Sequence, residues 1–172
     1  MALLPDHEIC RLCKQKQMVS PYNEELLNPA SIDVTLGGCI MVEVPQTPEL
    51  QRVCIEGYSQ AEPYMVEPGA FFLAETREIF NLPDHIGAQF VLKSSRARER
   101  FDHAEAGWCD PGWNGSRLTM ELRNQSQWHQ LPIWPDMKIG QLKFILISGV
   151  PERSYALTGR YNGDLGVTSS KG

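Results

Sequence analysis

Turn-forming residues interrupt this chain at short intervals along most of its length. Pairs typical of tight turns occur at Asn28-Pro29, Gly37-Gly38, Pro68-Gly69, Pro83-Asp84, Pro111-Gly112, Asn114-Gly115, Pro135-Asp136 and Asn162-Gly163. Segments that favour β-structure lie between them, at 31–36, 39–44, 70–74, 88–92, 118–122 and 141–147. Because many short strands joined by turns pack as antiparallel sandwiches or barrels, the sequence predicts a mainly β fold of this kind.

One helix is predicted, near the amino terminus. Residues 6–16 place Ile9, Leu12 and Cys13 on one helical face, and Asp6 is suited to cap the first turn. A length of 172 residues suits one domain, so residues 1–172 are expected to form a single β unit. The polar end of the chain, residues 160–172, is expected to be a mobile tail unless a ligand orders it.

Composition argues against several classes of protein. The net charge of −5 disfavours nucleic-acid binding, no apolar run is long enough to span a membrane, and the amino terminus lacks a secretory signal. Cys10 and Cys13 form a C-x-x-C pair, but no second pair and no nearby histidine pair completes a zinc site. We therefore expect a reduced, cytoplasmic protein without nucleic-acid or membrane partners, whose paired cysteines are incidental helix residues.

The segment from Lys93 to Glu121 concentrates cations, hydroxyls and carboxylates. Its first part, Lys-Ser-Ser-Arg-Ala-Arg at 93–98, follows a predicted strand. Hydroxyls, backbone amides and guanidinium groups at the end of a strand favour phosphate binding. A solvated turn or short helix, in which Glu99 pairs with its neighbours, explains the same residues equally well, and the sequence leaves both interpretations open.

Two carboxylates follow this cationic part. Asp110 opens the turn Asp-Pro-Gly-Trp, where it either caps its own backbone or presents a fixed carboxylate at the mouth of a pocket. Glu121 lies in an apolar strand whose alternation places Thr119 and Glu121 on one face and Met120 and Leu122 on the other. Facing solvent, Glu121 is an ordinary edge residue; facing inward it needs a cationic partner and suits a general base.

His103-Ala104-Glu105 matches the H-x-E of zinc-dependent nucleobase deaminases, which also require a P-C-x-x-C further along the chain. Only one cysteine, Cys109, follows His103. Because two thiolate ligands are missing from the required place, a zinc hydrolase of that type is excluded.

Four longer motifs resemble a known family. They are Lys-Ser-Ser-x-Ala-Arg at 93–98, Ala-Gly-Trp-x-Asp-Pro-Gly-Trp-x-Gly at 106–115, Met-Glu-Leu-x-Asn at 120–124 and Pro-Asp-Met-Lys-Ile-Gly-Gln-Leu at 135–142. In this order they resemble the dCTP deaminase and dUTPase superfamily, and segments 30–37 and 160–166 are similar to its deaminase branch. The resemblance implies a distorted β-barrel or jelly-roll of the dUTPase-like type, assembled as a homotrimer with active sites at subunit interfaces.

The resemblance also implies an activity, the zinc-free hydrolytic deamination of dCTP to dUTP and ammonia in the supply of dUMP and dTTP. The nucleotides dCTP, dUTP and dTTP are then the expected ligands, with Mg²⁺ bound through the triphosphate. A dUTP diphosphatase, a bifunctional dCTP deaminase/dUTPase and a catalytically silent nucleotide-binding or regulatory member stay open as alternatives.

Matching the motifs gives each site residue a role implied by the resemblance. Glu121 is the expected general base, Arg98 orients the attacking water and the carboxylate, and Ser94 lies near the reacting base and phosphates. Asp110 accepts the deoxyribose 3′-hydroxyl, and Tyr161 closes over the nucleotide as part of a lid. The other expected substrate-binding residues are Lys93, Ser95, Ala106, Arg160 and Asp164.

Some positions depart from the family pattern. Lys93 stands where arginine is usual, and Asp164 and Glu105 stand where glutamine and threonine are usual, which adds negative charge near a triphosphate. The spacer from Arg98 to Asp110 is about one residue shorter than the family spacing, and that from Gly115 to Glu121 is about one residue longer. In a strand, such an insertion turns a side chain to the opposite face unless a β-bulge absorbs it.

Overall fold

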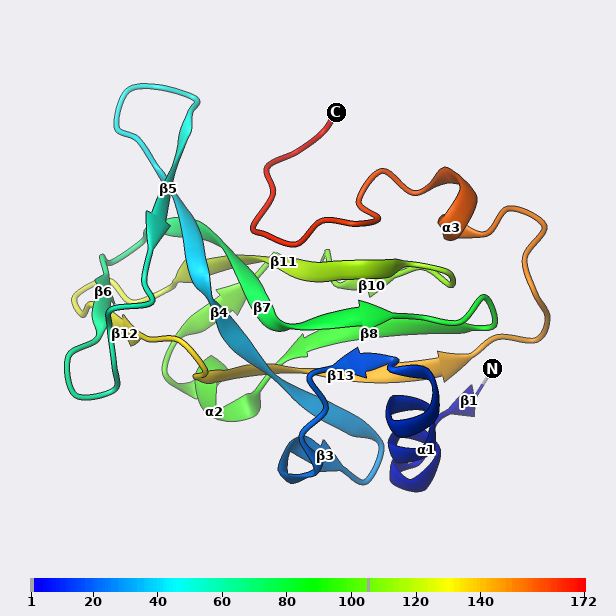
Figure 1. Ribbon diagram of the computed structural model, residues 1–172. Coiled ribbons are helices and arrows are strands. Elements are labelled where there is room, and N and C mark those ends of the chain that lie inside the picture. The colour runs from blue at the N-terminus through cyan, green and yellow to red at the C-terminus, as the bar shows by residue number, and fades with distance from the viewer. Residues whose placement is uncertain (1, 105) are drawn as a thin grey trace.

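The protein, described by a computed structural model for residues 2–104 and 106–172, is mainly β, as the sequence predicted (Figure 1). Glu105, one of the positions that depart from the family pattern, lies outside the described residues. The helices are α1 (Asp6–Lys16), the 3-10 helix η1 (Glu24–Leu26), α2 (Ser94–Arg98) and α3 (Tyr155–Thr158). The strands are β1 (Ala2–Leu3), β2 (Val19–Ser20), β3 (Leu27–Asn28), β4 (Ser31–Glu43), β5 (Leu50–Cys54), β6 (Tyr64–Val66), β7 (Phe71–Asn81), β8 (Ile86–Leu92), β9 (Phe101–His103), β10 (Trp108–Cys109), β11 (Asn114–Asn124), β12 (Leu131–Ile133) and β13 (Lys138–Leu146).

Most of these strands form one curled antiparallel sheet. Its order is β10-β8-β13-β4-β7-β11-β9, with β1, β2, β3 and β5 paired along its sides, whereas β6 pairs with β12 separately. The long strand β4 joins the two halves of the curl, because its first part pairs with β13 and its second part with β5 and β7. The core lies inside the curl and includes the fully buried side chains Phe72, Phe80, Phe144, Ile40, Met120 and Leu122.

The predicted turn at Gly37-Gly38 is wrong, since β4 continues through both glycines. A Cβ at Gly37 would lie 2.5 Å from Cγ of Glu75, and a Cβ at Gly38 would lie 2.0 Å from Oε1 of Glu56. These glycines therefore make room for side chains that pack across the strand, instead of bending the chain.

Helix α1 covers the range that the sequence predicted, and Ile9, Leu12 and Cys13 are its buried residues. The predicted cap is wrong, because Pro5 is the N-cap and the Asp6 carboxylate accepts a hydrogen bond from the adjacent amide of His7 at 2.7 Å. Burial raises the pKa of the Cys13 thiol to about 11.

Three further findings concern disulfides, metal sites and membrane-spanning helices. All five cysteines are free, so no disulfide constrains the fold. Within residues 2–104 and 106–172, no three side chains of the metal-ligating types form a group that could hold a metal ion. In the same two ranges, every helix is too short or too polar to cross a lipid bilayer.

Candidate active site

A cavity of about 620 Å³ opens between strands β7, β10 and β11 and the C-terminal segment that follows α3. Figure 1 shows this segment, in red, running above β10 and β11. Its walls include the apolar residues Phe71, Leu73 and Leu118. The polar residues of the walls include Asp110, Thr119, Glu121, Tyr161, Asp164 and Thr168. An apolar cavity with a few converging polar groups is typical of a binding site for a small molecule.

Glu121 faces this cavity from the middle of β11. The strand pairs with β7 through Glu121↔Leu73, while Met120 and Leu122 on the opposite face are fully buried in the core. The predicted facing of Glu121 is therefore confirmed. Side chains alternate between the two faces of a strand, so the burial of Met120 and Leu122 in the core places Glu121 on the face toward the cavity.

Two irregularities in the pairing of β11 with β7 precede Glu121. Between Asn114 and Ser116 the strand advances by two residues while its partner β7 advances by one, from Asn81 to Phe80. Gly115, the extra residue, has a φ of +63°, a left-handed conformation that glycine adopts readily. Between Arg117 and Thr119 the extra residues lie in β7, which advances from Ile79 to Glu75. The predicted turn at Asn114-Gly115 is thus a bulge within a strand.

A buried histidine lies beside Glu121. Nε2 of His103 is 3.4 Å from Oε2 of Glu121, and His103 is 9% exposed. Strand β9 brings it there by pairing His103 with Leu122, and its ring packs against Phe90 at a centroid distance of 4.7 Å. The resemblance assigned Arg98 to orient the Glu121 carboxylate in a site shared between subunits; within one chain His103, and not Arg98, lies beside Glu121, so the role of Arg98 stays a prediction.

Asp110 lies at the rim of the cavity in the predicted turn. Its backbone oxygen accepts a hydrogen bond from the amide of Trp113 at 3.1 Å, and its Oδ1 accepts one from Nε1 of Trp108 at 2.9 Å. The carboxylate is therefore held by a neighbouring indole. Next to it, burial raises the pKa of the Cys109 thiol to about 12, and the charges of Asp110 and Glu121 act in the same direction.

The C-terminal segment supplies one wall of the cavity. Tyr161 and Asp164 line it, as does Ala106 from the loop before β10, whereas the Arg160 side chain is exposed. Nζ of Lys171 lies 2.7 Å from Oδ2 of Asp164, 2.8 Å from the Arg160 oxygen and 5.1 Å from the ring centroid of Tyr161. The negative charge that Asp164 adds to the segment is therefore balanced within the same segment.

The predicted phosphate cradle lies apart from this cavity. Ser94, Ser95 and Arg98 belong to α2, which follows β8, and none of them lines the cavity. Figure 1 shows α2 at the lower left, whereas the C-terminal segment runs along the top. Arg96 pairs with Glu99 at 2.7 Å, the contact expected from a solvated short helix.

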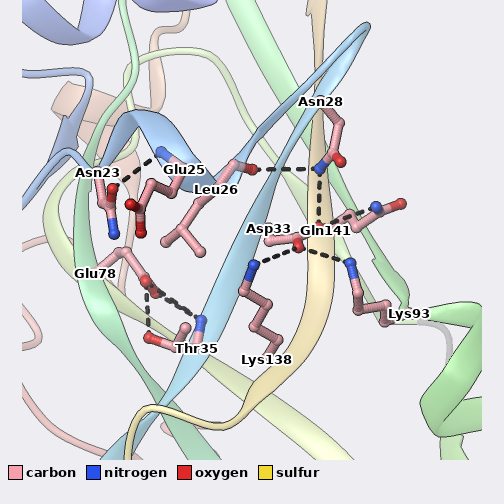
Figure 2. Close-up of polar contacts among 10 residues, drawn as sticks. All are labelled: Asn23, Glu25, Leu26, Asn28, Asp33, Thr35, Glu78, Lys93, Lys138 and Gln141. Carbon is pink, nitrogen blue, oxygen red and sulfur yellow. Dashed lines mark hydrogen bonds and ion pairs between the residues drawn. The ribbon is translucent and has the colours of Figure 1, made fainter.

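Lys93, just before α2, is bound to a buried carboxylate (Figure 2). Its Nζ donates to Oδ2 of Asp33 at 2.6 Å, while Asn28 and Gln141 donate to Oδ1 at 2.8 and 3.0 Å. Nζ of Lys138 lies 3.6 Å from the same Oδ2. Burial alone would raise the pKa of Asp33, but the hydrogen bonds from Lys93, Gln141 and Asn28 hold it below its ordinary value.

Known proteins are similar to this chain in sequence and in fold. The family described as dCTP deaminase-like matches residues 3–147. Over 98% of its length the chain is 34% identical to a protein of Rhodococcus opacus (strain B4) named "dCTP deaminase, dUMP-forming", of which 95% is covered. A protein of Clavibacter michiganensis subsp. michiganensis with the same name is 36% identical over 98% of this chain and 90% of its own length. This chain belongs to the dCTP deaminase-like family.

One solved structure supports the fold of this dCTP deaminase-like protein. The 2'-deoxycytidine 5'-triphosphate deaminase from Agrobacterium tumefaciens matches with a TM-score of 0.69. At 19% identity, the match covers 84% of this chain and 47% of that one.

Sequence reasoning missed three residues that contact predicted site residues of this dCTP deaminase-like protein: Asp33 beside Lys93, His103 beside Glu121 and Lys171 beside Asp164. Asp33 carried a signal, because a carboxylate between Ile32 and Val34 in a buried strand requires partners. The sequence around His103 and Lys171 gave no sign of their partners beyond the residue types. Strand pairing and the path of the C-terminal segment decide which carboxylates they meet.

Proposed function

We propose that this chain is a dUMP-forming dCTP deaminase, which removes ammonia and pyrophosphate from dCTP. The observation that carries the proposal is that Glu121 and Asp110, two carboxylates in different surroundings, face one cavity in a chain of this family. The names of the relatives correct the product expected from the sequence: dUMP replaces dUTP. We therefore propose the bifunctional dCTP deaminase/dUTPase activity, one of the alternatives left open by the sequence, instead of a deaminase that releases dUTP.

Glu121 is the proposed general base of the deamination. Its Oε2 is buried and has no hydrogen-bond partner within residues 2–104 and 106–172, although Nε2 of His103 lies 3.4 Å away. A carboxylate oxygen in this state can take a proton from water, whose oxygen then attacks C4 of cytosine. The proton passes to the amino group, the C4–N bond breaks, and ammonia leaves a uracil ring.

Asp110 is the proposed partner of the sugar and of the second water. Because Trp108 fixes Oδ1, Oδ2 is left to accept the 3′-hydroxyl or to orient a water molecule. Attack of that water on the α-phosphorus breaks its bond to the bridging oxygen and releases pyrophosphate, which leaves dUMP. Mg²⁺ bound through the triphosphate would supply positive charge to the phosphates, and Asp110 and Asp164 are cavity carboxylates that would help to hold it.

The phosphate-binding cations of this site are proposed to come from a second copy of the chain. Lys93, Ser94, Ser95 and Arg98 lie away from the cavity of their own chain, whose lining includes the cation Arg117, so the groups of the 93–98 motif reach a cavity only if α2 comes from a neighbour. A homotrimer with three shared sites meets this requirement, because each copy then gives its α2 to one neighbour and its cavity to the other.

The C-terminal segment, residues 160–172, is proposed to cover the bound nucleotide. It lines the cavity with Tyr161 and Asp164, and Lys171 neutralises Asp164, so the acidic substitution leaves no unpaired negative charge beside the phosphates. This pairing removes one of the reasons for the catalytically silent alternative, the added negative charge at Asp164.

Product analysis tests the proposal. The purified protein is incubated with Mg²⁺ and either dCTP or dUTP, and ammonia and pyrophosphate are quantified. Equal release of both from dCTP supports the proposal. Ammonia without pyrophosphate, pyrophosphate from dUTP alone, or binding without turnover would each overturn it in favour of one of the alternatives.

Substitution of Glu121 tests its role as the general base of the deamination step. Glu121→Gln is expected to slow ammonia release by about 10²–10⁴-fold, the usual contribution of a general base. Glu8→Gln is a matched control, because Glu8 forms a similar ion pair with Arg11 on α1, outside both the cavity and α2. Ammonia release that survives Glu121→Gln would remove Glu121 from the role of base.

Mixing two inactive variants tests the shared site. Glu121→Gln and Arg98→Ala are each expected to be inactive, whereas random mixed trimers restore both groups at about one site in four. Activity near a quarter of the wild-type value supports sites between subunits. If mixing restores no activity, Arg98 and Glu121 do not meet across an interface.

A further inference from the structure

Two side chains on neighbouring strands hold the C-terminal segment against the sheet. Glu75 on β7 and Thr119 on β11 are direct cross-strand partners. Oε2 of Glu75 accepts a hydrogen bond from the amide of Val167 at 2.6 Å. Oγ1 of Thr119 accepts one from the next amide, that of Thr168, at 3.1 Å. Two consecutive amides of the segment are therefore bound by one cross-strand pair.

The surroundings of Glu75 make this contact costly to lose. Glu75 is 6% exposed and Val167 is 7% exposed, so both the carboxylate and the residue that it binds are buried. A buried carboxylate needs hydrogen-bond donors to replace the water it has lost, and the Val167 amide is such a donor.

Gly166 allows the segment to come this close. A Cβ at Gly166 would lie 3.3 Å from Nη2 of Arg52 and 3.6 Å from Oε2 of Glu75. A side chain there would contact the flexible end of Arg52 closely and shift it by a few tenths of an ångström. The backbone at Gly166 thus passes beside both Arg52 and Glu75, with its next amide directed at Glu75.

The contact also holds hydroxyl-bearing residues at the wall of the cavity that Glu121 faces. Thr168, whose amide is bound, and the adjacent residues Ser169 and Ser170 line the cavity that contains Glu121. Glu75 itself is not among the residues around that cavity and reaches it only through the backbone of Val167.

We propose that Glu75 and Thr119 form a clamp that holds the C-terminal segment closed over the active site, with Glu75 as a positioning residue. The clamp sets where the hydroxyls of residues 168–170 lie relative to Glu121. Its role in turnover rests on the proposed function, in which the segment covers the nucleotide, but its effect on the segment is measurable without any substrate.

Amide hydrogen exchange on the intact, nucleotide-free protein tests the clamp. Glu75→Gln replaces a charged acceptor by a neutral one and is expected to speed exchange at Val167 about fivefold to tenfold. Thr119→Val removes the hydroxyl at constant shape and is expected to speed exchange at Thr168 by a similar factor, about fivefold, while Thr119→Ser restores the slow rate. Glu49→Gln, at an exposed site, is the matched control and is expected to change neither amide.

The exchange rates of the core amides in β7 and β11 show whether the substitutions loosen only the C-terminal segment or the whole sheet. In a clamp these amides keep wild-type protection while Val167 and Thr168 exchange faster. Unchanged exchange at Val167 in Glu75→Gln, or an equal loss of protection throughout β7 and β11, would overturn the proposal.

Steady-state kinetics of Glu75→Gln add a second readout. Because Glu75 acts on closure and not on the reacting atoms, KM for dCTP is expected to rise while kcat stays within about twofold of wild type. A fall in kcat at constant KM would place Glu75 in the chemistry and overturn the positioning role. If the exchange results hold but the wild type turns over no dCTP, the clamp stands and the proposed function falls.

Discussion

Replacing Asp33 with asparagine keeps the shape of the side chain but removes its charge. Asn28 and Gln141 still find an acceptor at Oδ1, whereas the new amide group meets the Nζ of Lys93 donor to donor. A hydrogen bond to a charged group contributes about 1.5–3 kcal/mol, and the two remaining bonds each weaken by about 0.5–1 kcal/mol when their acceptor becomes neutral. Because the Lys93 side chain is 27% exposed, water partly replaces its lost partner. We therefore expect a loss of about 2–3 kcal/mol in the free energy of unfolding.

Urea denaturation of both proteins at one fixed concentration measures this difference, and a fall of about 5–10 °C in Tm should accompany it. The loss of stability in Asp33→Asn should also depend on pH in a defined direction. The pKa of Asp33 is lowered in the folded protein, so its carboxylate stabilises the fold fully above its unfolded pKa, about 3.9. This stabilisation is lost as the pH falls through the folded pKa. The difference between wild type and Asp33→Asn should therefore be complete at pH 7 and shrink in acid.

Asp136→Asn is the matched control for this prediction. Asp136 accepts a hydrogen bond from Nε of Arg77 at 2.8 Å, but its side chain is 69% exposed. Its φ of +65° suits asparagine, and an exposed ion pair contributes about 0–1 kcal/mol. If Asp33→Asn proved no more destabilising than Asp136→Asn, or if its effect persisted unchanged in acid, the assigned role of the buried carboxylate would be refuted.

The remaining predictions concern packing and thiol reactivity. Met120→Ala, at a fully buried position, is expected to lower the free energy of unfolding by about 2–5 kcal/mol. Met65→Ala, at a position 40% exposed, should cost less than about 1 kcal/mol in the same urea titration, and similar losses would contradict the assigned core. A thiol reagent at pH 8 should label the exposed Cys54 in the folded protein, whereas Cys13 and Cys109, with pKa values raised by burial to about 11 and 12, should react only after denaturation. Rapid labelling of either buried thiol would contradict its burial.

Local features of the fold were accessible from the sequence because they repeat over a few residues. The alternation in β11 predicted that Glu121 and Met120 face opposite sides, and the structure confirms it. The same local reasoning failed at Gly37-Gly38, where the glycines accommodate Glu75 and Glu56 from other parts of the chain. A pair of glycines reads as a turn unless the side chains packed against it are known.

The candidate site was predictable only in part, because the motifs identify residue types but not neighbours. Asp110 and Glu121 do share one cavity, as the family resemblance implied. Arg98, which the resemblance places near Glu121 in a shared site, lies in α2, and within one chain His103 lies beside Glu121 instead. Which side chain meets a carboxylate depends on strand pairing between distant segments, and a single sequence does not encode this in any short pattern.

The sequence by itself determined the mainly β architecture, the helix at 6–16, the facing of Glu121 and the family resemblance, since these follow from local periodicity and from contiguous motifs. Only the tertiary structure decided that the cationic segment 93–98 lies away from the two carboxylates, that Asp33 holds Lys93, and that Glu75 binds the C-terminal segment. The physical reason is common to all three. Each contact joins groups on separate strands or segments, and its geometry exists only after the sheet has curled and brought them together.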